Sequence, residues 1–385
     1  MKILLVGNYP FLQSQSMDRF ADMLYGGLKG AGHEVELINP RPLIGLIRPS
    51  PEGLGKWLGY IDRFVIFPER LRNAAARADV VHICDQANAI YASWLNGKPH
   101  LVTCHDMLAI SSALGEIPQN PTRFTGRVYQ QWILRGLKRA QHVVCVSDKT
   151  RSELLRLAAI PSDRVSVVPN ALNYPYRRMG EAEAGLRLQR LGLRSDQPFL
   201  LHVGGNNWYK NRKGLLDIFS RLAEMGEFCN YRFVLAGKPM PPELLAIASS
   251  KPLSGRVYES LRPSNEDLQA LYSSAKALVF PSLSEGFGWP IIEAQACGCP
   301  VFTSNRPPMT QVGGDAAVYI DPDDPAGSAG IIAGCLLGGV DRAEQGVKNA
   351  ARFSKEAFVS GYLEACRVVL HGFSSERHLA VREVL

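Results

Sequence analysis

Short apolar segments alternate with longer stretches of helical periodicity along this chain, and few folds are compatible with that alternation. Six segments lie at residues 2–6, 34–38, 80–84, 100–104, 142–146 and 165–168. Six more follow at residues 199–203, 232–236, 256–258, 277–280, 301–303 and 317–320. Runs of this kind, separated by helices, are typical of buried parallel strands. The sequence therefore predicts an α/β fold with two Rossmann-like, doubly wound parallel sheets.

Residues 169–198 interrupt the alternation. They contain an aromatic and proline patch, a pair of arginines and a short helical stretch with little apolar content, so we place the domain connection there. We expect domains at 1–175 and 176–385 that face each other across a cleft, and a last helix at about 355–370 that is a candidate to pack back on the first domain. In such sheets ligands bind beyond the carboxyl ends of the strands.

The composition narrows the possible partners. The chain has 385 residues, a net charge of +7, 46% hydrophobic and 21% charged residues, which is typical of a soluble globular protein. Residues 1–175 carry 20 Lys and Arg against 14 Asp and Glu, so the excess lies in the first half. It fits an anionic ligand or a membrane surface but lacks the dense basic stripe of a nucleic-acid binder, and we expect no nucleic-acid partner.

Metal sites and membrane spans have little support in the sequence. The eight cysteines lie mostly in apolar runs, without the spacing of a zinc site. Asp321-Pro322-Asp323-Asp324 contains an Asp-x-Asp, but its Pro-rich setting favours helix capping over cation binding. No apolar stretch approaches 18 residues and the start lacks a signal sequence. We expect a cytoplasmic protein with no metal and no cofactor, and at most peripheral contact with the inner membrane surface.

The segment 279–301 holds the most informative motif. A strand ends at its beginning, a Gly-rich loop follows, and Pro290 suits the first position of a helix. Glu285 would then lie in the loop and Glu293 in the first helical turn, while Gly286 and Gly288 leave backbone amides open to a ligand. Carboxylates accept from sugar hydroxyls and amides donate to them. The alternative is that both acids merely complement the helix dipole.

The string SEGFGWPIIEAQACGCP resembles the Glu-x7-Glu signature of family 4 glycosyltransferases, retaining nucleotide-sugar enzymes of the GT-B fold. The resemblance extends over nearly the whole chain, through GHEVEL, VTCHD, VVCVSDKT, VSVVPNALN, LHVGGNNWYKNRKGLL, EDLQALYSSAKALVFPS and IDPDDP. It implies that Glu285 contacts the hydroxyls of the donor sugar. It also implies that the backbone of Gly286, Phe287 and Gly288 contacts that sugar and the phosphates, and that Glu293 contacts the ribose.

Basic residues cluster directly after the strand at 199–203. Lys210, Arg212 and Lys213 precede a helical pattern, and cations there would stabilise the charge that develops on a leaving nucleoside diphosphate. In the family an Arg usually follows the first Gly of this loop, but here the sequence is Gly204-Gly205-Asn206. Lys210 best matches the family lysine and Lys213 matches its Lys-Gly form. The alternative is a solvated basic loop.

Polar residues also follow the strands of the first domain. His105 and Asp106 come after the strand at 100–104, where a His beside an Asp could bind a donor-sugar hydroxyl or help to position the acceptor. The resemblance implies that His105 faces the donor sugar, and Asp106 is a weak candidate on the acceptor side. Asp85, Gln86 and Asn88 follow the strand at 80–84 and are weaker candidates on the acceptor side. The alternative for His105 is a histidine whose hydrogen bonds are satisfied within the protein. Gln15-Ser16-Met17 stands where the family commonly has a Gly doublet.

Residues 56–77 interleave aromatic and apolar side chains with basic ones. A helix of this kind in the basic half of the chain could lie on an anionic membrane and bring a lipid-linked acceptor to the site. The alternative is a packing helix whose arginines extend to solvent. The residues concerned are Trp57, Tyr60, Ile61, Phe64 and Phe67, with Lys56, Arg63, Arg70, Arg72 and Arg77.

These features predict a metal-independent retaining glycosyltransferase. It would move a hexose from a nucleotide sugar, a UDP-sugar being favoured, to a hydroxyl of a glycan or lipid-linked acceptor, in envelope or exopolysaccharide synthesis. Glu285, Lys210 and His105 form the predicted catalytic set. A GT-B-like nucleotide-sugar epimerase and a non-catalytic nucleotide- or carbohydrate-binding protein are the alternatives.

Overall fold

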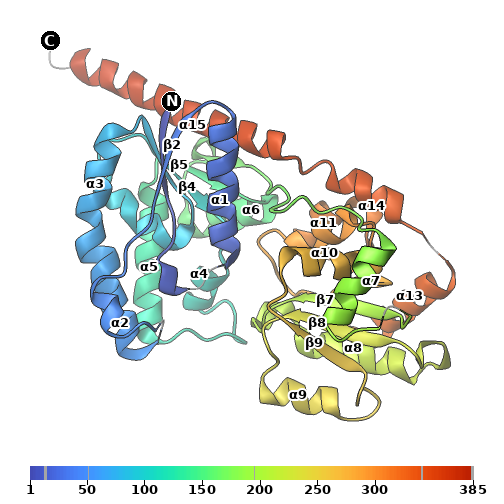
Figure 1. Cartoon of the computed structure of the whole chain (residues 1–385). Coiled ribbons are helices and arrows are strands. Elements are labelled where there is room, and N and C mark those ends of the chain that lie inside the picture. The colour runs from blue at the N-terminus through green and yellow to red at the C-terminus, as the bar shows by residue number, and fades with distance from the viewer. Residues whose placement is uncertain (13–14, 51, 195, 340, 383–385) are drawn as a thin grey trace. The chain divides into compact units, whose positions relative to one another are not determined.

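The chain divides into two compact units, each built around its own sheet (Figure 1). The computed structural model describes residues 1–382 except 13, 14, 51, 195 and 340, with side chains described up to residue 372. The N-terminal unit comprises Met1–Asn173 and Lys355–Leu385, and the C-terminal unit comprises Tyr174–Ser354. Each contains a six-stranded sheet in which every pair of neighbours is parallel, so the predicted α/β fold class is confirmed.

The sheet of the N-terminal unit has the order β2-β1-β3-β4-β5-β6. After β1 the chain adds β2 on one side and then returns to add β3 on the other, so the strand order reverses between β1 and β3. In doubly wound sheets this reversal is where ligands bind. The strands are β1 (Lys2–Val6), β2 (Glu34–Ile38), β3 (Val80–Ile83), β4 (His100–Cys104), β5 (His142–Cys145) and β6 (Val165–Val167).

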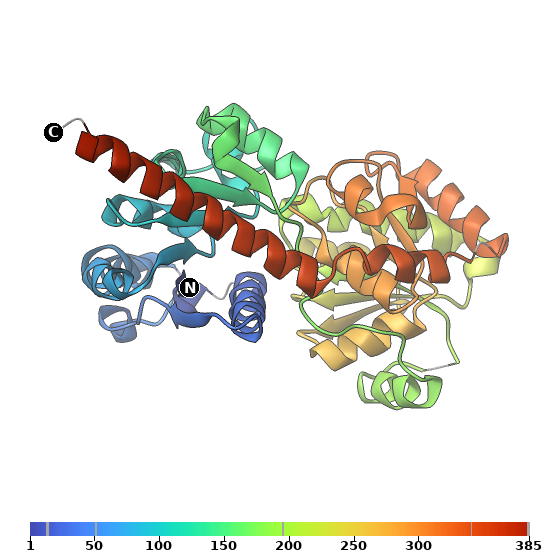
Figure 2. The same cartoon turned by 90° about the horizontal axis from the view of Figure 1, so that it is seen from above.

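Helices cover both faces of this sheet. The long C-terminal helix α15 packs beside α1 and against β3, β4 and β5, and Figure 2 shows it running along the N-terminal unit. On this face His82 stacks on Tyr362, with the ring centroids 5.1 Å apart. The helices of the unit are α1 (Gln15–Gly30), α2 (Gly53–Ile61), α3 (Phe67–Arg77), α4 (Leu108–Ala113), α5 (Phe124–Arg139), α6 (Asp148–Ala158) and α15 (Lys355–Arg382).

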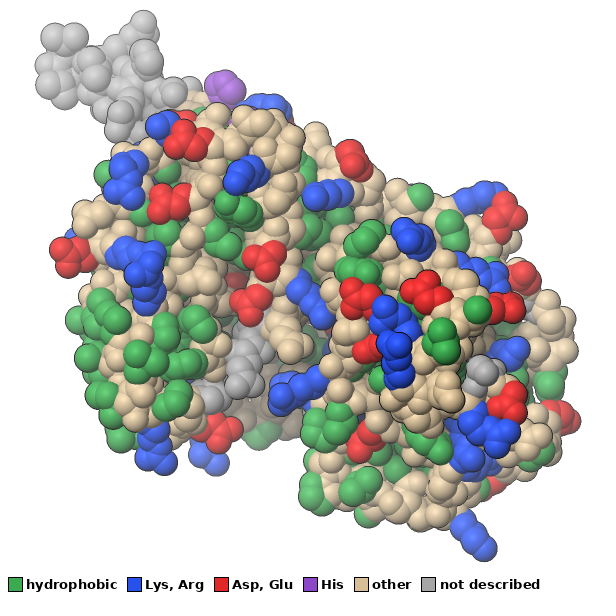
Figure 3. All heavy atoms as spheres, viewed as in Figure 1, with side chains coloured by type: hydrophobic (Ala, Val, Ile, Leu, Met, Phe, Trp, Pro, Cys, Tyr) green, Lys and Arg blue, Asp and Glu red, His purple; other side chains and the backbone are tan. Residues whose placement is uncertain are grey.

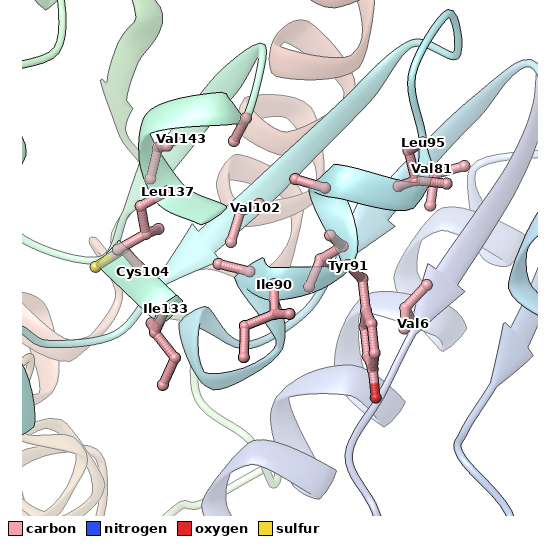
Figure 4. Close-up of a cluster of buried hydrophobic side chains, with 14 of the residues drawn as sticks. Val6, Val81, Ile90, Tyr91, Leu95, Val102, Cys104, Ile133, Leu137 and Val143 are labelled. Atoms are coloured by element: carbon pink, nitrogen blue, oxygen red, sulfur yellow. The ribbon is translucent and has the colours of Figure 1, made fainter. Parts of the chain in front are cut away.

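The opposite face of the sheet carries the main apolar core of the unit. Strand side chains alternate between the two faces, so Val81 and Ile83 enter this core while His82 points to α15. Ile90 and Tyr91 come from the 3₁₀ segment η4 (Gln86–Trp94), and α3 and α5 supply further side chains. Figure 4 shows this cluster, whose core members are almost completely removed from water.

The C-terminal unit repeats the plan with the order β12-β11-β10-β7-β8-β9. Its chain proceeds from β7 through β8 to β9, then crosses back to place β10 on the other side of β7. The strand order therefore reverses between β7 and β10. The strands are β7 (Phe199–Gly204), β8 (Arg232–Gly237), β9 (Val257–Leu261), β10 (Ala277–Phe280), β11 (Val301–Ser304) and β12 (Val318–Ile320).

The core of the C-terminal unit lies between its sheet and the helices α8 and α13. Phe219 of α8 stacks on Phe233 of β8 with their ring centroids 4.2 Å apart, and both rings are buried. Helices α10 and α11 pack together elsewhere in the unit, and α11 also contacts α14. The helices are α7 (Glu181–Arg190), α8 (Arg212–Glu224), α9 (Pro242–Ser249), α10 (Asn265–Ser274), α11 (Trp289–Ala296), α12 (Met309–Gly313), α13 (Pro325–Leu337) and α14 (Ala343–Ala350).

Two further predictions concern cysteines and membrane spans. Six of the eight cysteines are buried, as expected for core residues, whereas Cys229 is exposed and Cys335 is partly buried. Within the described part of the chain, no helix combines the length and the apolar character that crossing a membrane would require.

Candidate active site

The reversal point of the C-terminal sheet holds an ion pair between the two residues that head the predicted catalytic set. The Lys210 Nζ lies 2.7 Å from the Glu285 Oε1, and the side chains are 15% and 8% exposed. Lys210 follows β7 and Glu285 follows β10, which are neighbours in the sheet. The ammonium also lies over the ring of Phe280, 4.9 Å from its centroid. A cation and an acid thus meet, mostly shielded from water, where this fold binds ligands.

Lys210 is held in place by the residue that follows it. Asn211 adopts a left-handed conformation, with φ 52°, and its Oδ1 accepts from the Gly214 amide at the start of α8. Its Nδ2 donates to the carbonyls of Pro281 and Pro322, at 3.1 and 3.2 Å. One side chain therefore joins the loops after β7, β10 and β12. This bracing fixes the backbone from which Lys210 projects.

The loop that carries Glu285 depends on Gly288. Its φ of 103° lies in a region that other residues rarely adopt, and the helix α11 begins immediately after it. The prediction that Pro290 takes the first helical position is wrong, since Trp289 precedes it in α11. Phe287 turns inward, where its ring meets that of Phe353 edge to face at 5.6 Å. The side chain of Phe287 thus anchors the loop.

Glu293 lies deeper in the helix than expected. No acid occurs in the first turn of α11, and Glu293 is 4% exposed. Tyr272 of α10 donates its hydroxyl to the Glu293 Oε2 at 2.9 Å. Burial, and then the charge of Glu293, raise the pKa of Tyr272, so this tyrosine stays a donor at neutral pH. The prediction of a first-turn position is wrong because α11 starts one residue earlier than Pro290.

Arg212 takes a different place from the one expected of a phosphate contact. Its Nη2 donates to the Gly204 carbonyl at 2.7 Å, and its Nη1 donates to the Asn206 Oδ1 and the Lys238 carbonyl at 2.6 and 2.9 Å. The side chain is buried and braces the loops after β7 and β8. Lys213, in contrast, is exposed in the first turn of α8.

Two buried acceptors near this pair have no hydrogen-bond partner among the described residues, the His202 Nε2 and the Ser282 Oγ. The His202 Nδ1 lies 3.0 Å from the Val279 carbonyl, which requires a proton on Nδ1 and leaves Nε2 as an acceptor. Burial, and then the nearby Arg212 charge, lower the pKa of His202 to about 3. His202 is therefore neutral across the physiological range.

The reversal point of the N-terminal sheet holds a network of amides and one acid. Asn8, which follows β1, donates its Nδ2 to the Asp85 Oδ2 at 2.7 Å and accepts from the Asn88 Nδ2 at 2.5 Å. Asp85 also accepts from the Ala87 amide and caps η4. All three side chains are buried. Asp85 and Asn88, both candidates from the sequence, thus lie in one network, and Asn8 links them.

Arg63 contacts this network through Asn88. Its Nη2 donates to the Tyr129 hydroxyl at 2.8 Å and contacts the Asn88 Oδ1 at 3.4 Å. The guanidinium lies over the ring of Phe64 and is 2% exposed, and it makes no ion pair with any described residue. Arg63 therefore points into the unit, which differs from both alternatives of the sequence analysis, a helix on a membrane surface and a packing helix whose arginines extend to solvent.

His105 is buried beside this network. Its Nε2 lies 2.8 Å from the Cys84 carbonyl, and its amide donates to the Gln86 Oε1 at 2.8 Å. Burial lowers the pKa of His105, while the charge of Asp85 opposes that shift. Asp106 accepts from the Leu108 amide at 3.0 Å and so helps to begin α4. These contacts satisfy much of the hydrogen bonding of the two residues within the unit.

The Asp-Pro-Asp-Asp turn caps a helix, as predicted. The Asp324 Oδ1 accepts from the Gly327 amide at 3.0 Å at the start of α13, and Asp321 accepts from the Asp323 amide. Among the described residues there is also no group of three or more His, Cys, Asp or Glu arranged to hold a metal ion.

Several site residues were missed by the sequence analysis. Asn8, Lys238 and His202 lie in or directly after predicted strands, so a systematic search of strand ends would have found them. Lys238 is exposed beside the Gly205 backbone, where it adds a cation to the edge that carries Lys210. Tyr272 has no such signal, because it comes from the middle of a helix.

Known proteins share the fold of this chain. The model described as "Glycosyltransferase Family 4" matches residues 17–174, and the one described as "Glycosyl transferases group 1" matches residues 187–353. Sucrose-phosphate synthase of Thermosynechococcus elongatus superposes with a TM-score of 0.75 at 19% identity, covering 97% of this chain and 100% of that one. HepE of Anabaena, solved with UDP-glucose, gives 0.70 at 16%, with 97% and 100% covered. The fold is therefore that of the GT-B glycosyltransferases.

Curated relatives agree with the two family models. O-antigen chain mannosyltransferase B of Escherichia coli is 29% identical over 277 residues, which is 70% of this chain and 71% of that protein. O-antigen chain mannosyltransferase RfbU of Salmonella typhimurium is 28% identical over 212 residues, 53% of this chain and 54% of the relative, so that match spans about half of each protein. Together these matches support a glycosyltransferase of the GT4 type.

Proposed function

We propose that this glycosyltransferase moves a hexose from a nucleotide sugar to a hydroxyl of a glycan or lipid-linked acceptor, with retention at the anomeric carbon. The observation that carries the proposal is the Lys210 and Glu285 pair, 2.7 Å apart at the point where the strand order of the C-terminal sheet reverses. The site offers a cation for a diphosphate and a carboxylate for sugar hydroxyls, which are the two parts of an activated sugar.

In the proposed reaction the C-terminal unit binds the donor. The Lys210 ammonium neutralises charge on the departing diphosphate oxygen, and a preorganised donor of this kind in a shielded site contributes up to about 4 kcal/mol to the transition state. Lys213, in the first turn of α8, and Lys238, directly after β8, are exposed and supply further positive charge. Arg212 acts through the loop that it braces and does not need to touch the substrate.

Glu285 accepts hydrogen bonds from hydroxyls of the donor sugar. In the free protein its charge is balanced by Lys210, which spares the fold an unpaired acid that is mostly shielded from water. When the donor binds, hydrogen bonds from the sugar hydroxyls replace part of the contact that Glu285 makes with Lys210. The negative charge of the diphosphate then takes the place of Glu285 beside Lys210. Glu293 is the residue proposed to contact the ribose. It would have to do so from its buried position, where it accepts a hydrogen bond from Tyr272.

The N-terminal unit supplies the acceptor side of the proposal. Asp85, Gln86, Asn88 and His105 lie at the strand ends of that unit. Asn8 links Asp85 to Asn88, and the His105 amide donates to the Gln86 side chain. Their proposed work is to shape the acceptor site. We assign no catalytic base, because attack on the face of the leaving group lets the phosphate oxygen take the acceptor proton, and the protein contributes orientation and charge.

The relatives suggest a hexose and a pathway. Two curated relatives are named O-antigen chain mannosyltransferases, and a structural neighbour was solved with UDP-glucose. Mannose and glucose are therefore the first sugars to test, on UDP, GDP and ADP. Assembly of an envelope or extracellular polysaccharide is the proposed setting.

The proposal is tested in two stages. Thermal-shift screening against UDP-, GDP- and ADP-activated glucose and mannose identifies the donor, since a ligand that binds only the folded state raises the melting temperature. The selected donor is then incubated with lipid-linked and free glycan acceptors, and the anomeric configuration of the product is read by NMR. Isomerised sugar formed from the donor alone would indicate the epimerase alternative. Binding without any turnover would indicate the non-catalytic one.

A further inference from the structure

Exposed apolar side chains concentrate on one surface of the N-terminal unit. Three segments form it: the 3₁₀ turn η2 (Ile44–Ile47) with Leu43, the helix α2 with the following π-helical turn η3 (Asp62–Ile66), and the first turns of α5. Of the 21 large hydrophobic residues exposed in the described chain, 11 lie here, too many for scattered surface residues. They are Leu43, Leu46, Ile47, Leu54, Trp57, Ile61, Val65, Ile66, Phe124, Val128 and Trp132.

The surface is continuous across the three segments. Trp57 of α2 meets Tyr60 edge to face at 5.5 Å, and Tyr60 stacks on Tyr129 of α5 at 5.6 Å. Phe64 of η3 lies 5.1 Å from Trp132 of α5. Figure 3 shows hydrophobic side chains gathered over the lower left of the N-terminal unit, around α2, with Lys and Arg side chains at the border.

A buried acid holds the outer segments in this arrangement. Asp62 accepts from the Tyr9 hydroxyl at 2.8 Å and from the amides of Leu43, Ile44 and Gly45 at 2.9 to 3.1 Å. These bonds tie η2 to the end of α2. Ile47 and Val65 are nevertheless 75% and 71% exposed. The buried Asp62 carboxylate thus stabilises a local structure whose apolar side chains face the exterior.

The rim of the surface is positively charged. Arg41, Arg48, Lys56, Arg123 and Arg127 are exposed on the same segments or directly beside them, against the exposed acid Glu52. Apolar side chains flanked by basic ones fit the boundary of an anionic bilayer, where acyl chains meet phosphate headgroups. A protein partner would need no such cationic rim. The charge therefore favours lipid as the occupant.

We propose that this surface docks the enzyme on an anionic membrane, with Ile47, Trp57, Val65 and Phe124 entering the headgroup boundary. The region 56–77 contributes less than its sequence suggested, because Arg63 and Phe67 are buried, whereas η2 and α5 contribute side chains that the sequence analysis did not select. The same turn that presents Val65 outward points Arg63 inward to Asn88. A lipid-linked acceptor on this surface would therefore lie against the unit that holds the proposed acceptor network.

The test is sedimentation of the full chain with vesicles, and it needs neither donor nor acceptor. We expect binding to phosphatidylglycerol vesicles at low salt, at least tenfold weaker binding to phosphatidylcholine vesicles, and loss of binding as salt screens the rim. Trp57→Glu and Phe124→Glu should each weaken binding at least tenfold. Leu337→Glu replaces an exposed leucine of the C-terminal unit, and should bind as the wild type does.

Three outcomes would overturn the proposal. One is the absence of binding to anionic vesicles at low salt, and another is full binding by Trp57→Glu with an unchanged melting temperature. The third is concentration-dependent dimerisation of the wild type without lipid that Trp57→Glu abolishes, which would assign the surface to a second copy of the chain. Vesicle binding is measured without turnover, so it tests the membrane proposal even if the transfer assay fails. The transfer assay likewise tests the proposed function even if the protein does not bind vesicles.

Discussion

Both units place polar side chains where their strand order reverses, but the two sets differ in chemistry. In the C-terminal unit a full positive and a full negative charge meet, Lys210 with Glu285, and the lysine retains 15% exposure. In the N-terminal unit the Asn8, Asp85 and Asn88 side chains satisfy one another and are buried. Charged groups held near a binding edge act on developing charge, whereas a satisfied amide network fixes a shape. The comparison assigns the donor chemistry to one unit and acceptor positioning to the other.

The supporting arginines sharpen this contrast. Arg212 donates to the Gly204 and Lys238 carbonyls, so it stabilises the backbone of the loops around the ion pair. Arg63 contacts the Asn88 side chain and the Tyr129 hydroxyl, so it stabilises the network itself. Each buried cation thus stabilises the loops or side chains of its own unit.

The largest expected effect separates the two reversal points by kinetics. Lys210→Met should lower kcat by at least about 10³-fold, because it removes about 4 kcal/mol of transition-state stabilisation. Asn88→Ala should mainly raise the KM for the acceptor and leave the affinity for the donor nearly unchanged. Steady-state kinetics with each substrate varied in turn measures both effects. Equal losses of kcat in the two variants would contradict the assignment of donor chemistry to one unit and acceptor positioning to the other.

A second prediction compares the buried histidines His82 and His202, one in each sheet. Burial is the main cause that lowers the pKa of each to about 3, whereas the unfolded chain protonates near 6.5. The unfolded state therefore binds more protons between pH 6.5 and 3, and stability falls as the pH is lowered through that window. Each histidine contributes a slope of about 1.4 kcal/mol per pH unit.

Urea unfolding at several pH values measures that slope. His82→Gln and His202→Gln should each flatten it, whatever their effect on stability at pH 7. If one unit unfolds before the other, the variant in the less stable unit will change the first transition. An unchanged slope in both variants would show that these histidines are not neutral in the folded protein.

Arg63 tests whether the N-terminal network is structural. Arg63→Met keeps most of the apolar volume but removes the donor to the Asn88 Oδ1 and the Tyr129 hydroxyl, which should cost about 1 to 3 kcal/mol in the free energy of unfolding. Arg63→Lys keeps a donor and should recover part of that loss. Chemical denaturation measures both. A stability equal to that of the wild type in Arg63→Met would remove Arg63 from the account of this network.

The smallest expected effect concerns the Glu285 loop. Gly288→Ala forces a side chain into a φ of 103° and places a Cβ 3.2 Å from the Ile291 Cδ1, which should cost about 1 to 2 kcal/mol of stability. Gly192→Ala is the matched control, because Gly192 also has a positive φ, of 77°, but has open space around it and lies away from the loop. Donor affinity should fall in Gly288→Ala alone.

Much of the fold could be predicted from the sequence, and the reason is physical. All twelve strands begin within one residue and end within three residues of their predicted positions. The central strands are recognisable because a parallel strand inside a sheet is apolar on both faces. Lys210 and Glu285 could be found for the same reason, since both follow predicted strands. Their side chains meet because β10 lies beside β7. The order of strands in a sheet cannot be predicted from the sequences of the strands alone.

The sequence is least informative where the direction of a side chain decides its role. Arg212 and Arg63 look like surface cations in sequence, but each finds carbonyls or hydroxyls inside its unit. In residues 56–77 the helical periodicity was read as one continuous helix. The π-helical turn at Asp62–Ile66 changes the number of residues per turn, so the face that follows it is rotated. Leu46, Ile47 and Phe124 lie outside that segment, and their proximity to it is set by the fold.

The most direct test of the central claim is the transfer rate of Glu285→Gln with the donor identified by thermal shift. This change keeps the size and shape of the side chain, removes its charge and replaces one acceptor oxygen with an amide donor. We predict a fall in kcat/KM of at least about 10²-fold, equivalent to about 2.7 kcal/mol, with a melting temperature close to that of the wild type. Turnover near the wild-type level in this folded variant would contradict the assignment of the site.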